Sequence, residues 1–295
     1  MLGLSKFFGK NNTDKRDQEI SSILPLSSCN AECESCPTKF PSGLKIDEDS
    51  DIYNSAKPTD VHFIIPTSKT DWAHDATSTP NTVENAIVAW KDKYGDDIIK
   101  DGNFKVSTSS LPFDSVDPRC YKSEVNDVLI LPFFVWLRKI EYQNVDQVLN
   151  KLIPLLIKLR DEGSELPKKI DNYRLFPAIE QAFIFLCSHR TRDKRCGITA
   201  PLMKKEMDAH LRDLELYRDV CDDRPNGINV SFINHVGGHK FAANVIIYMK
   251  TGEIIWLARC NPANAKPIID ETVLGGGKVW GDLVRVVQKT KSVEW

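Results

Sequence analysis

The sequence predicts an α/β fold, and the order of its apolar segments is the main reason. Short apolar runs typical of buried strands alternate with longer segments whose apolar residues recur at helical spacing. Strand, helix, strand, strand, helix is the order in the first half of the 295-residue chain, and the second half repeats it. A polar stretch with prolines separates the two halves. We therefore predict two α/β domains of one plan.

The first half contains three predicted strands and two predicted helices. Val83, Ile87 and Trp90 share one face of the first helix, and the second helix ends near Gly163. The predicted strands span residues 61–68, 104–112 and 126–134, and the helices span residues 81–95 and 145–163.

The second half begins with a predicted strand over residues 182–187 and a helix that starts at Thr199. Further strands are predicted over residues 228–236, 241–249 and 254–260, with a short helix from Pro262. This order is the thioredoxin-like plan, so we predict two diverged thioredoxin-like domains. The predicted organisation is a largely polar extension (1–57), a first domain (58–163), a linker (164–178) and a second domain (179–295).

Composition restricts the class of protein. With 41% hydrophobic and 27% charged residues and a net charge of -2, the chain shows no electrostatic preference for nucleic acid. The longest apolar run, residues 128–137, contains Pro132 and is half of the ~20 residues that a membrane-spanning helix needs. Residues 1–16 lack the features of secretory and mitochondrial signals. We expect a cytoplasmic protein without a membrane span; the nucleus is left open as an additional location, and a mitochondrial location is less favoured.

Two cysteines and two histidines follow predicted strands at what we expect to be one end of a sheet. Cys187 ends one strand and Cys196 lies nine residues later, while His235 and His239 follow the strand that contains residues 230–233. Thiolate and imidazole are ligands that iron and zinc prefer. The H-x3-H spacing fits zinc, but structural zinc sites usually hold cysteines closer together. The wider cysteine loop suits a 2Fe-2S cluster, and both metals remain open at this point.

The segments around these four residues resemble the fungal sucrase/ferredoxin-like family. The resemblance is carried by CSHRTRDKRCGITAP, NHVGGHKFAANVIIY and IIWLARCNP, and it continues more loosely through VHFIIPTSKTDWAHDA and NDVLILPFFVWL. It implies that the second half is a thioredoxin-like ferredoxin. It also implies a 2Fe-2S cluster held by Cys187, Cys196, His235 and His239.

The resemblance further implies electron transfer in redox or oxidative-stress homeostasis, with an unknown redox partner. Coupling of that electron transfer to proton transfer is an additional hypothesis, because imidazole exchanges protons. The alternative is a zinc-stabilised interaction module linked to actin patch organisation, after which members of the family are named. We expect an electron carrier rather than a substrate-transforming enzyme, and the sequence leaves open whether a small molecule is turned over.

Four residues beside the cysteines have a structural and a functional interpretation. His189 is too close to Cys187 to be a further ligand, and we interpret it as a residue that supports the ligands or relays protons. Arg192, Lys194 and Arg195 are typical of a solvated loop. Between two cysteine ligands, however, their charge would favour thiolate and stabilise a reduced cluster.

The first half carries no comparable constellation. Cys120, His62 and His74 do not fall at the ligand positions of the second half. A histidine within a strand, such as His62, is more often hydrogen-bonded packing than a metal ligand. We predict that this half holds no cluster and that it covers the second domain or presents a surface to a partner.

The remaining cysteines favour reduced thiols rather than a disulfide framework, because no secretory signal is evident. Cys29, Cys33 and Cys36 lie in a polar segment. A loop with surface thiols is favoured there over a zinc or redox site. Cys221 and Cys260 have no partner at ligand spacing, and we expect Cys260 to be buried.

The chain ends in an acidic residue followed by an aromatic one, Glu294 and Trp295. Terminal residues are usually disordered. This pair nevertheless resembles the tail by which client proteins are recognised by the cytosolic iron-sulfur assembly targeting complex, which is therefore an expected partner.

Overall fold

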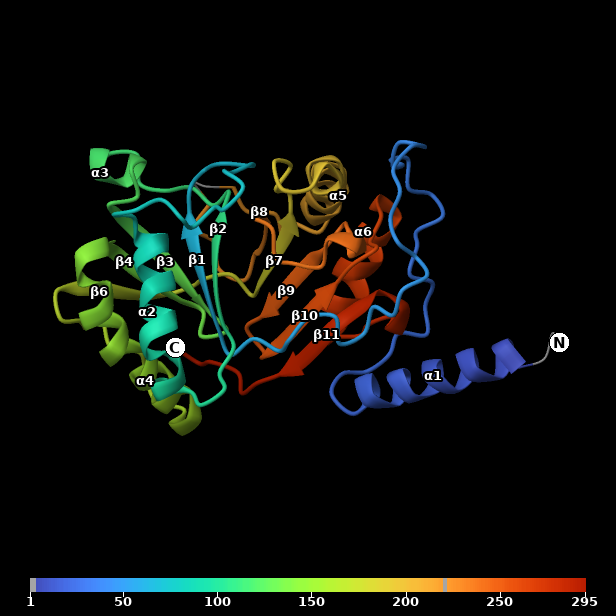
Figure 1. Cartoon of the computed structure of the whole chain (residues 1–295), viewed down its shortest axis with the longest axis horizontal. Helices are drawn as coiled ribbons and strands as arrows, with labels where there is room; N and C mark the ends of the chain where they lie inside the picture. The colour runs from blue at the N-terminus through green and yellow to red at the C-terminus, as the bar shows by residue number, and fades with distance from the viewer. Residues whose placement is uncertain (1–3, 220–221) are drawn as a thin grey trace.

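One mixed sheet runs through the whole molecule. The computed structural model describes residues 4–219 and 222–295, so Cys221 lies outside the described residues, as do the side chains of residues 4–12 and His239. Within this part, eleven strands follow the order β11-β10-β9-β7-β8-β2-β1-β3-β4-β6-β5 (Figure 1). The strands are β1 (Val61–Pro66), β2 (Phe104–Ser109), β3 (Val125–Leu131), β4 (Val135–Glu141), β5 (Lys169–Ile170), β6 (Tyr173–Pro177), β7 (Ala182–Cys187), β8 (Ile228–Ile233), β9 (Val245–Met249), β10 (Glu253–Leu257) and β11 (Val284–Lys289).

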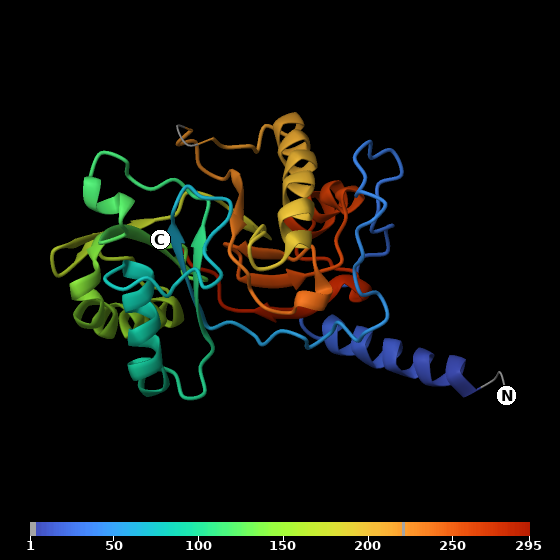
Figure 2. The ribbon, with the colours of Figure 1, turned by 45° about the horizontal axis from the view of Figure 1, so that its top comes forward.

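The helices pack around this sheet. In the first half α2 and α4 lie side by side, and in the second half α5 contacts β7 and β8 (Figure 2). The helices are α1 (Leu4–Ser21), α2 (Val83–Ile98), α3 (Pro118–Tyr121), α4 (Val145–Glu162), α5 (Lys194–Asp213) and α6 (Ala265–Pro267), the last continuing as a π-helical segment, Ile268–Val273. Among the described helices, none is both long and apolar enough to cross a bilayer.

Strand alternation divides the core into layers. Phe63 of β1 packs in the cluster that includes residues of α2 and α4, whereas its neighbour Ile64 faces the opposite side of the sheet. In β7, Ile184 packs with residues of α5, and Phe185 joins the same cluster as Ile64. The two halves therefore share a buried apolar layer and fold onto each other.

A narrow seam joins the two half-sheets. β2 and β8 pair antiparallel at Ser109 and Ile233. Asn234 extends this pairing. Its side-chain Oδ1 accepts a hydrogen bond from the Thr108 N–H at 3.2 Å, and its backbone N–H donates to the Thr108 carbonyl at 3.0 Å. A side chain thus replaces a backbone acceptor directly before His235.

The segment predicted as a linker contains regular structure, and the predicted domain boundaries stay a prediction. Residues 164–178 were expected to form a linker, but they contain β5 and β6, and β6 pairs with β4. Strands β4 and β11 were also absent from the predicted element order. Strands β5 and β6 form the outer edge of the first half-sheet, although a polar composition indicated a loop there. The thioredoxin-like description of each half stays a prediction.

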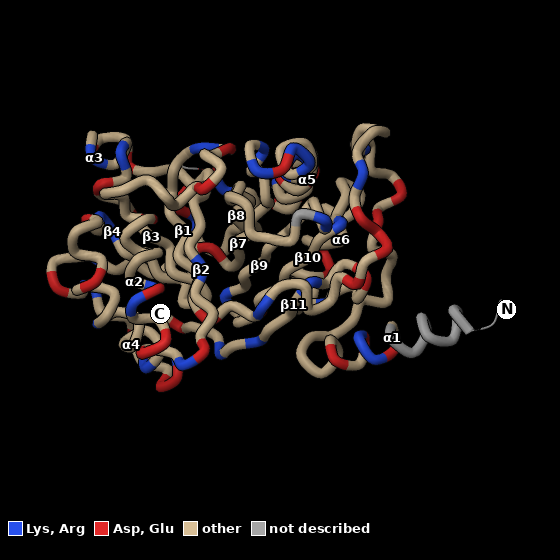
Figure 3. The backbone as a smooth tube through the Cα atoms, viewed as in Figure 1, with Lys and Arg blue, Asp and Glu red and all other residues tan. Residues whose placement is uncertain are grey.

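The N-terminal extension is more structured than its polar composition suggested. Ile20 and Leu24 are buried in the core of the second half, and Ile52 packs with Phe241 and Ala258. These few apolar residues anchor a segment that is otherwise polar, so composition alone did not reveal its packing. Lys and Arg positions are interspersed with Asp and Glu positions along the described backbone of both halves (Figure 3).

Candidate metal centre

Two neighbouring strands deliver the first thiol and the first imidazole to one edge of the sheet. β7 and β8 are parallel, and their last register pair joins Cys187 to Ile233. Because parallel strands end at the same edge, the chain after Ile233 places His235 beside Cys187. The prediction that these two strands share an end is confirmed.

Helix α5 supplies the second thiol. The sequence predicted that this helix starts at Thr199, but it begins at Lys194 because Asp193 caps it, its Oδ1 accepting a hydrogen bond from the Arg195 N–H at 2.9 Å. Cys196 is therefore in the first turn, where the helix dipole favours a thiolate. Its side chain is buried, with 1% of its surface exposed.

Three of the four predicted ligands come together. The sulfur atoms of Cys187 and Cys196 and a ring nitrogen of His235 lie within 4.8 Å of one another. The Cys187 Sγ is 3.8 Å from the His235 Nδ1. Both cysteines are buried free thiols. His239 begins a short 3-10 turn four residues after His235, but its side chain lies outside the described part of the structure, so its role as a ligand stays a prediction.

The two buried thiols titrate as a pair. The hydrogen bond from Cys196 lowers the pKa of Cys187 well below its ordinary value, and the neighbouring His235 lowers it further. The same contact with Cys187, together with burial, raises the pKa of Cys196. These directions leave the proton on Cys196, where it is donated in a hydrogen bond to the Cys187 thiolate. A bound metal would replace that proton.

The donor set fits a thiophilic metal and does not by itself distinguish zinc from iron. The distance between Cys187 and His235 is close to that between two ligands of one tetrahedral ion, given bond lengths of ~2.3 Å to sulfur and ~2.0 Å to nitrogen. Each iron of a 2Fe-2S cluster also takes two protein ligands. The three donor atoms lie close enough to hold one metal ion, whereas the ligands of a 2Fe-2S cluster are divided between two irons.

His189 supports the backbone of a ligand. Its Nδ1 accepts a hydrogen bond from the His235 N–H at 3.2 Å, and its Nε2 lies 3.1 Å from the Trp72 carbonyl. These contacts are consistent with an Nε2–H tautomer. Burial lowers the pKa of His189 and favours the neutral ring. His189 thereby positions His235, and the proposed relay of protons stays a prediction.

The basic residues beside the cysteines are directed elsewhere. Arg195 forms an ion pair with Asp193 at 2.8 Å, and Arg192 donates to the His74 ring at 2.8 Å. Lys194 is exposed. Most of the positive charge that the sequence suggested for the thiols is therefore offset by Asp193 or turned to solvent.

Comparison with known proteins identifies the family of the chain. The model of the sucrase/ferredoxin-like family matches residues 52–286. The chain belongs to this family. It is 40% identical over 266 residues to the actin patches distal protein 1 of Saccharomyces cerevisiae. The aligned residues are 88% of this chain and 83% of that protein.

More distant relatives align with a shorter part of the chain. The altered inheritance of mitochondria protein 32 of Debaryomyces hansenii is 36% identical over 100 residues, which are 33% of each chain. The protein of the same name from Meyerozyma guilliermondii is 32% identical over 98 residues, covering 33% of this chain and 32% of that protein. No solved structure matches.

Other cysteines of this family member occupy different environments. Cys260 is fully buried, as predicted, and burial raises the pKa of its thiol. Cys29 is exposed, and Cys33 and Cys36 are partly exposed, in agreement with a surface loop. Cys33 donates or accepts a hydrogen bond with Ser35 that lowers its pKa.

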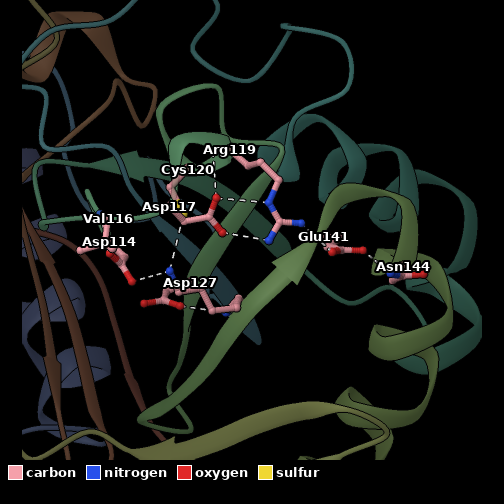
Figure 4. Close-up of polar contacts among 9 residues, drawn as sticks. Asp114, Val116, Asp117, Arg119, Cys120, Asp127, Glu141 and Asn144 are labelled. Atoms are coloured by element: carbon pink, nitrogen blue, oxygen red, sulfur yellow. Dashed lines mark hydrogen bonds and ion pairs between the residues drawn. The ribbon is translucent and has the colours of Figure 1, made fainter.

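Cys120 of the first half lies in a polar network rather than among metal ligands. Figure 4 shows Arg119 bonded through two nitrogens to Asp117 beside it. The Lys139 Nζ lies 3.8 Å from the Cys120 sulfur and also forms an ion pair with Asp114. This network ties the loop before α3 to β4.

Sequence reasoning missed one residue near the centre. Arg285 of β11 is almost fully buried, with 1% of its surface exposed, and its Nη1 donates to the Gly237 carbonyl at 3.1 Å. Gly237 lies in the turn between His235 and His239. An arginine between valines in a short apolar segment was the only available signal, and that signal does not indicate what the side chain contacts.

Proposed function

We propose that the chain is a cytosolic electron carrier that binds one 2Fe-2S cluster through Cys187, Cys196, His235 and His239. The observation that supports this proposal most directly is the convergence of two buried thiols and His235 within 4.8 Å. The donors come from the end of β7, the first turn of α5 and the chain after β8. The second half would then be the thioredoxin-like ferredoxin domain.

Burial favours electron transfer over thiol chemistry. Reactive cysteines that exchange disulfides need access for a second sulfur. Cys187 and Cys196 are each only 1% exposed, so the approach of a sulfur from another molecule is blocked. An electron needs no such access. With two neutral imidazoles in place of two thiolates, the reduction potential is expected in the span of about -150 to +300 mV, above the ~-400 mV of plant-type ferredoxins.

A zinc-stabilised interaction module is the second candidate, and one observation favours it. The donor atoms lie close enough to surround one tetrahedral ion without rearrangement. A relative of this chain is named for actin patches, which agrees with an interaction module but does not describe a chemistry.

Metal analysis distinguishes the two candidates. The full-length protein is purified anaerobically, and iron, zinc and acid-labile sulfide are measured per chain together with the visible spectrum. The proposal requires two irons and two sulfides per chain and a coloured protein. One zinc per chain with neither iron nor sulfide would establish the alternative.

We further propose that Glu294 and Trp295 are recognised by the cytosolic iron-sulfur assembly targeting complex. Trp295 is half-buried, and its indole N–H donates to the Phe133 carbonyl at 2.6 Å. Glu294 is exposed. The tail crosses from β11 to the first half (Figure 1). Recognition of the indole therefore requires the tail to leave this position.

A further inference from the structure

Arg285 is a buried cation whose hydrogen-bond partners are all neutral. Its Nε donates to the Ser55 Oγ at 3.1 Å and its Nη2 to the Ser55 carbonyl at 2.9 Å. Its Nη1 donates to the Asn244 Oδ1 at 2.7 Å and to the Gly237 carbonyl at 3.1 Å. Among the described residues, no carboxylate forms a hydrogen bond or ion pair with the guanidinium. A buried charge without a counter-charge is unfavourable.

The guanidinium lies against the turn that separates the two candidate histidine ligands. A Cβ atom at Gly238 would lie only 2.4 Å from the Arg285 Nη2, so the glycine permits the backbone to approach. Gly238 also has a φ of 73°, which favours glycine. Arg285 thus fixes the position of the turn between His235 and His239.

The charge of Arg285 is also within electrostatic reach of a candidate thiolate. Burial lowers the pKa of the guanidinium, and the negative charge of Cys187 opposes this shift. Of the cations beside the cysteines, Arg195 already pairs with a carboxylate, Arg192 donates to the His74 ring and Lys194 is exposed. Arg285 has no carboxylate partner among the described residues, and only a metal centre with a net negative charge would supply the missing counter-charge.

The sign of the effect follows from the charge of the centre. A 2Fe-2S cluster with two thiolates and two neutral imidazoles has no net charge when both irons are ferric, and one added electron makes it negative. A zinc ion with the same four ligands stays neutral. We infer that Arg285 raises the reduction potential of the cluster by stabilising its reduced form. Arg285 also positions the turn between the histidines. This inference rests on the proposed function.

The test is a mediated redox titration of the loaded full-length protein, in which a dye supplies the single electron and no bond is formed or broken. Arg285→Gln removes the charge and keeps a hydrogen-bond donor. We expect at least a tenfold decrease in the equilibrium constant for reduction, which is 59 mV for a one-electron couple. Arg285→Lys keeps the charge and should stay within threefold of the wild type.

Arg218→Gln is the matched control. Arg218 is 10% exposed and donates to backbone carbonyls, including that of Tyr217 at 2.8 Å, but it also contacts Asp222. Tyr217 forms an isolated β-bridge with Ile228, the first residue of β8. Ile228 lies roughly 16 Å from the other end of that strand, where the candidate site begins. This variant should leave the potential within threefold of the wild type.

A second variant decides the question if Arg285→Gln loses the cluster. Asn244→Asp places a carboxylate on the intact guanidinium and should lower the equilibrium constant for reduction at least tenfold. An unchanged potential in Arg285→Gln, or in Asn244→Asp where it is needed, would overturn this inference and leave the proposed function standing. Absence of iron and sulfide from the wild-type protein would overturn both.

Discussion

The Nδ1 of His62 lies 2.8 Å from the hydroxyl of Tyr248, and this contact joins β1 of the first half to β9 of the second. The other ring nitrogen lies 2.9 Å from the Ser107 Oγ. The imidazole is fully buried, as expected for a packing histidine rather than a ligand. One ring therefore links the two halves inside their shared apolar layer.

His62 makes the stability of the fold dependent on pH. Burial, followed by the nearby Lys105, lowers the pKa of His62 well below 6.5. Below about pH 6.5 the unfolded chain binds a proton that the folded chain excludes, so stability is lost as the pH falls. We expect the free energy of unfolding to decrease by up to ~1.4 kcal/mol per pH unit from this residue.

Urea unfolding at several pH values between 7 and 5 measures this slope in wild type and His62→Gln. The variant should be less stable at pH 7, but its free energy of unfolding should fall less steeply as the pH falls. The other titrating groups are common to both proteins, so the difference in slope reports His62. Tyr248→Phe is the control because it removes the hydrogen bond but keeps the buried imidazole, and its slope should resemble that of the wild type. Equal slopes in wild type and His62→Gln would contradict this account.

The seam between the half-sheets should control both stability and the metal centre. Asn234→Ala removes the side-chain acceptor of the Thr108 N–H and should lower the free energy of unfolding by about 1–3 kcal/mol, the cost of a buried unsatisfied donor. Iron content should also fall, because the next residue is His235. Asn229→Ala alters the same strand away from the seam and should change the iron content little.

The thiols should be essential for metal binding. Cys187→Ser and Cys196→Ser should lose most of the bound iron, whereas His235→Cys should retain a cluster with a lower reduction potential, because thiolate adds negative charge. Cys36→Ser, in the surface loop, is the control and should keep the full iron content. Wild-type iron content in Cys187→Ser would exclude Cys187 as a ligand.

The C-terminal tryptophan should contribute to stability. Deletion of Trp295 removes its hydrogen bond to Phe133 and its half-buried indole. We expect a loss of roughly 1–3 kcal/mol in reconstituted protein, less than the 3–5 kcal/mol typical of a fully buried tryptophan. Glu294→Ala alters an exposed residue and should not change the stability measurably.

The targeting proposal predicts a separate effect of the same deletion in cells. The truncated protein should carry less iron and should lose binding to the assembly targeting complex, while reconstitution in vitro should restore its iron. Full iron occupancy in cells with intact binding would show that the terminal aromatic has no targeting role.

The sequence predicted the parts of the centre that depend on local pattern. The apolar runs that end at Cys187 and Ile233 behave as parallel strands, so the convergence of Cys187 and His235 followed from their positions. The start of α5 was misplaced because Thr199 is also a good cap residue, whereas Asp193 lies within a charged run. As a result, the position of Cys196 in the first helical turn was not foreseen.

Contacts between segments that are distant in the chain could not be predicted from sequence patterns. Arg285 contacts Ser55, 230 residues away, and Trp295 contacts Phe133, 162 residues away. Neither residue stands out by periodicity or spacing. The single continuous sheet was missed for the same reason, because the seam rests on a few hydrogen bonds of Asn234 and its neighbours rather than on a long apolar run.

Pulsed electron paramagnetic resonance of the reduced protein tests the central claim most directly, since it detects the cluster and its nitrogen ligands together. Protein labelled with 15N only in histidine is reduced with dithionite and compared with unlabelled protein. We predict a spin-half signal with nitrogen couplings that change on labelling, and loss of one coupling in His235→Cys. A protein without such a signal, or a signal whose nitrogen couplings are the same in labelled and unlabelled samples, would contradict cluster binding by these histidines.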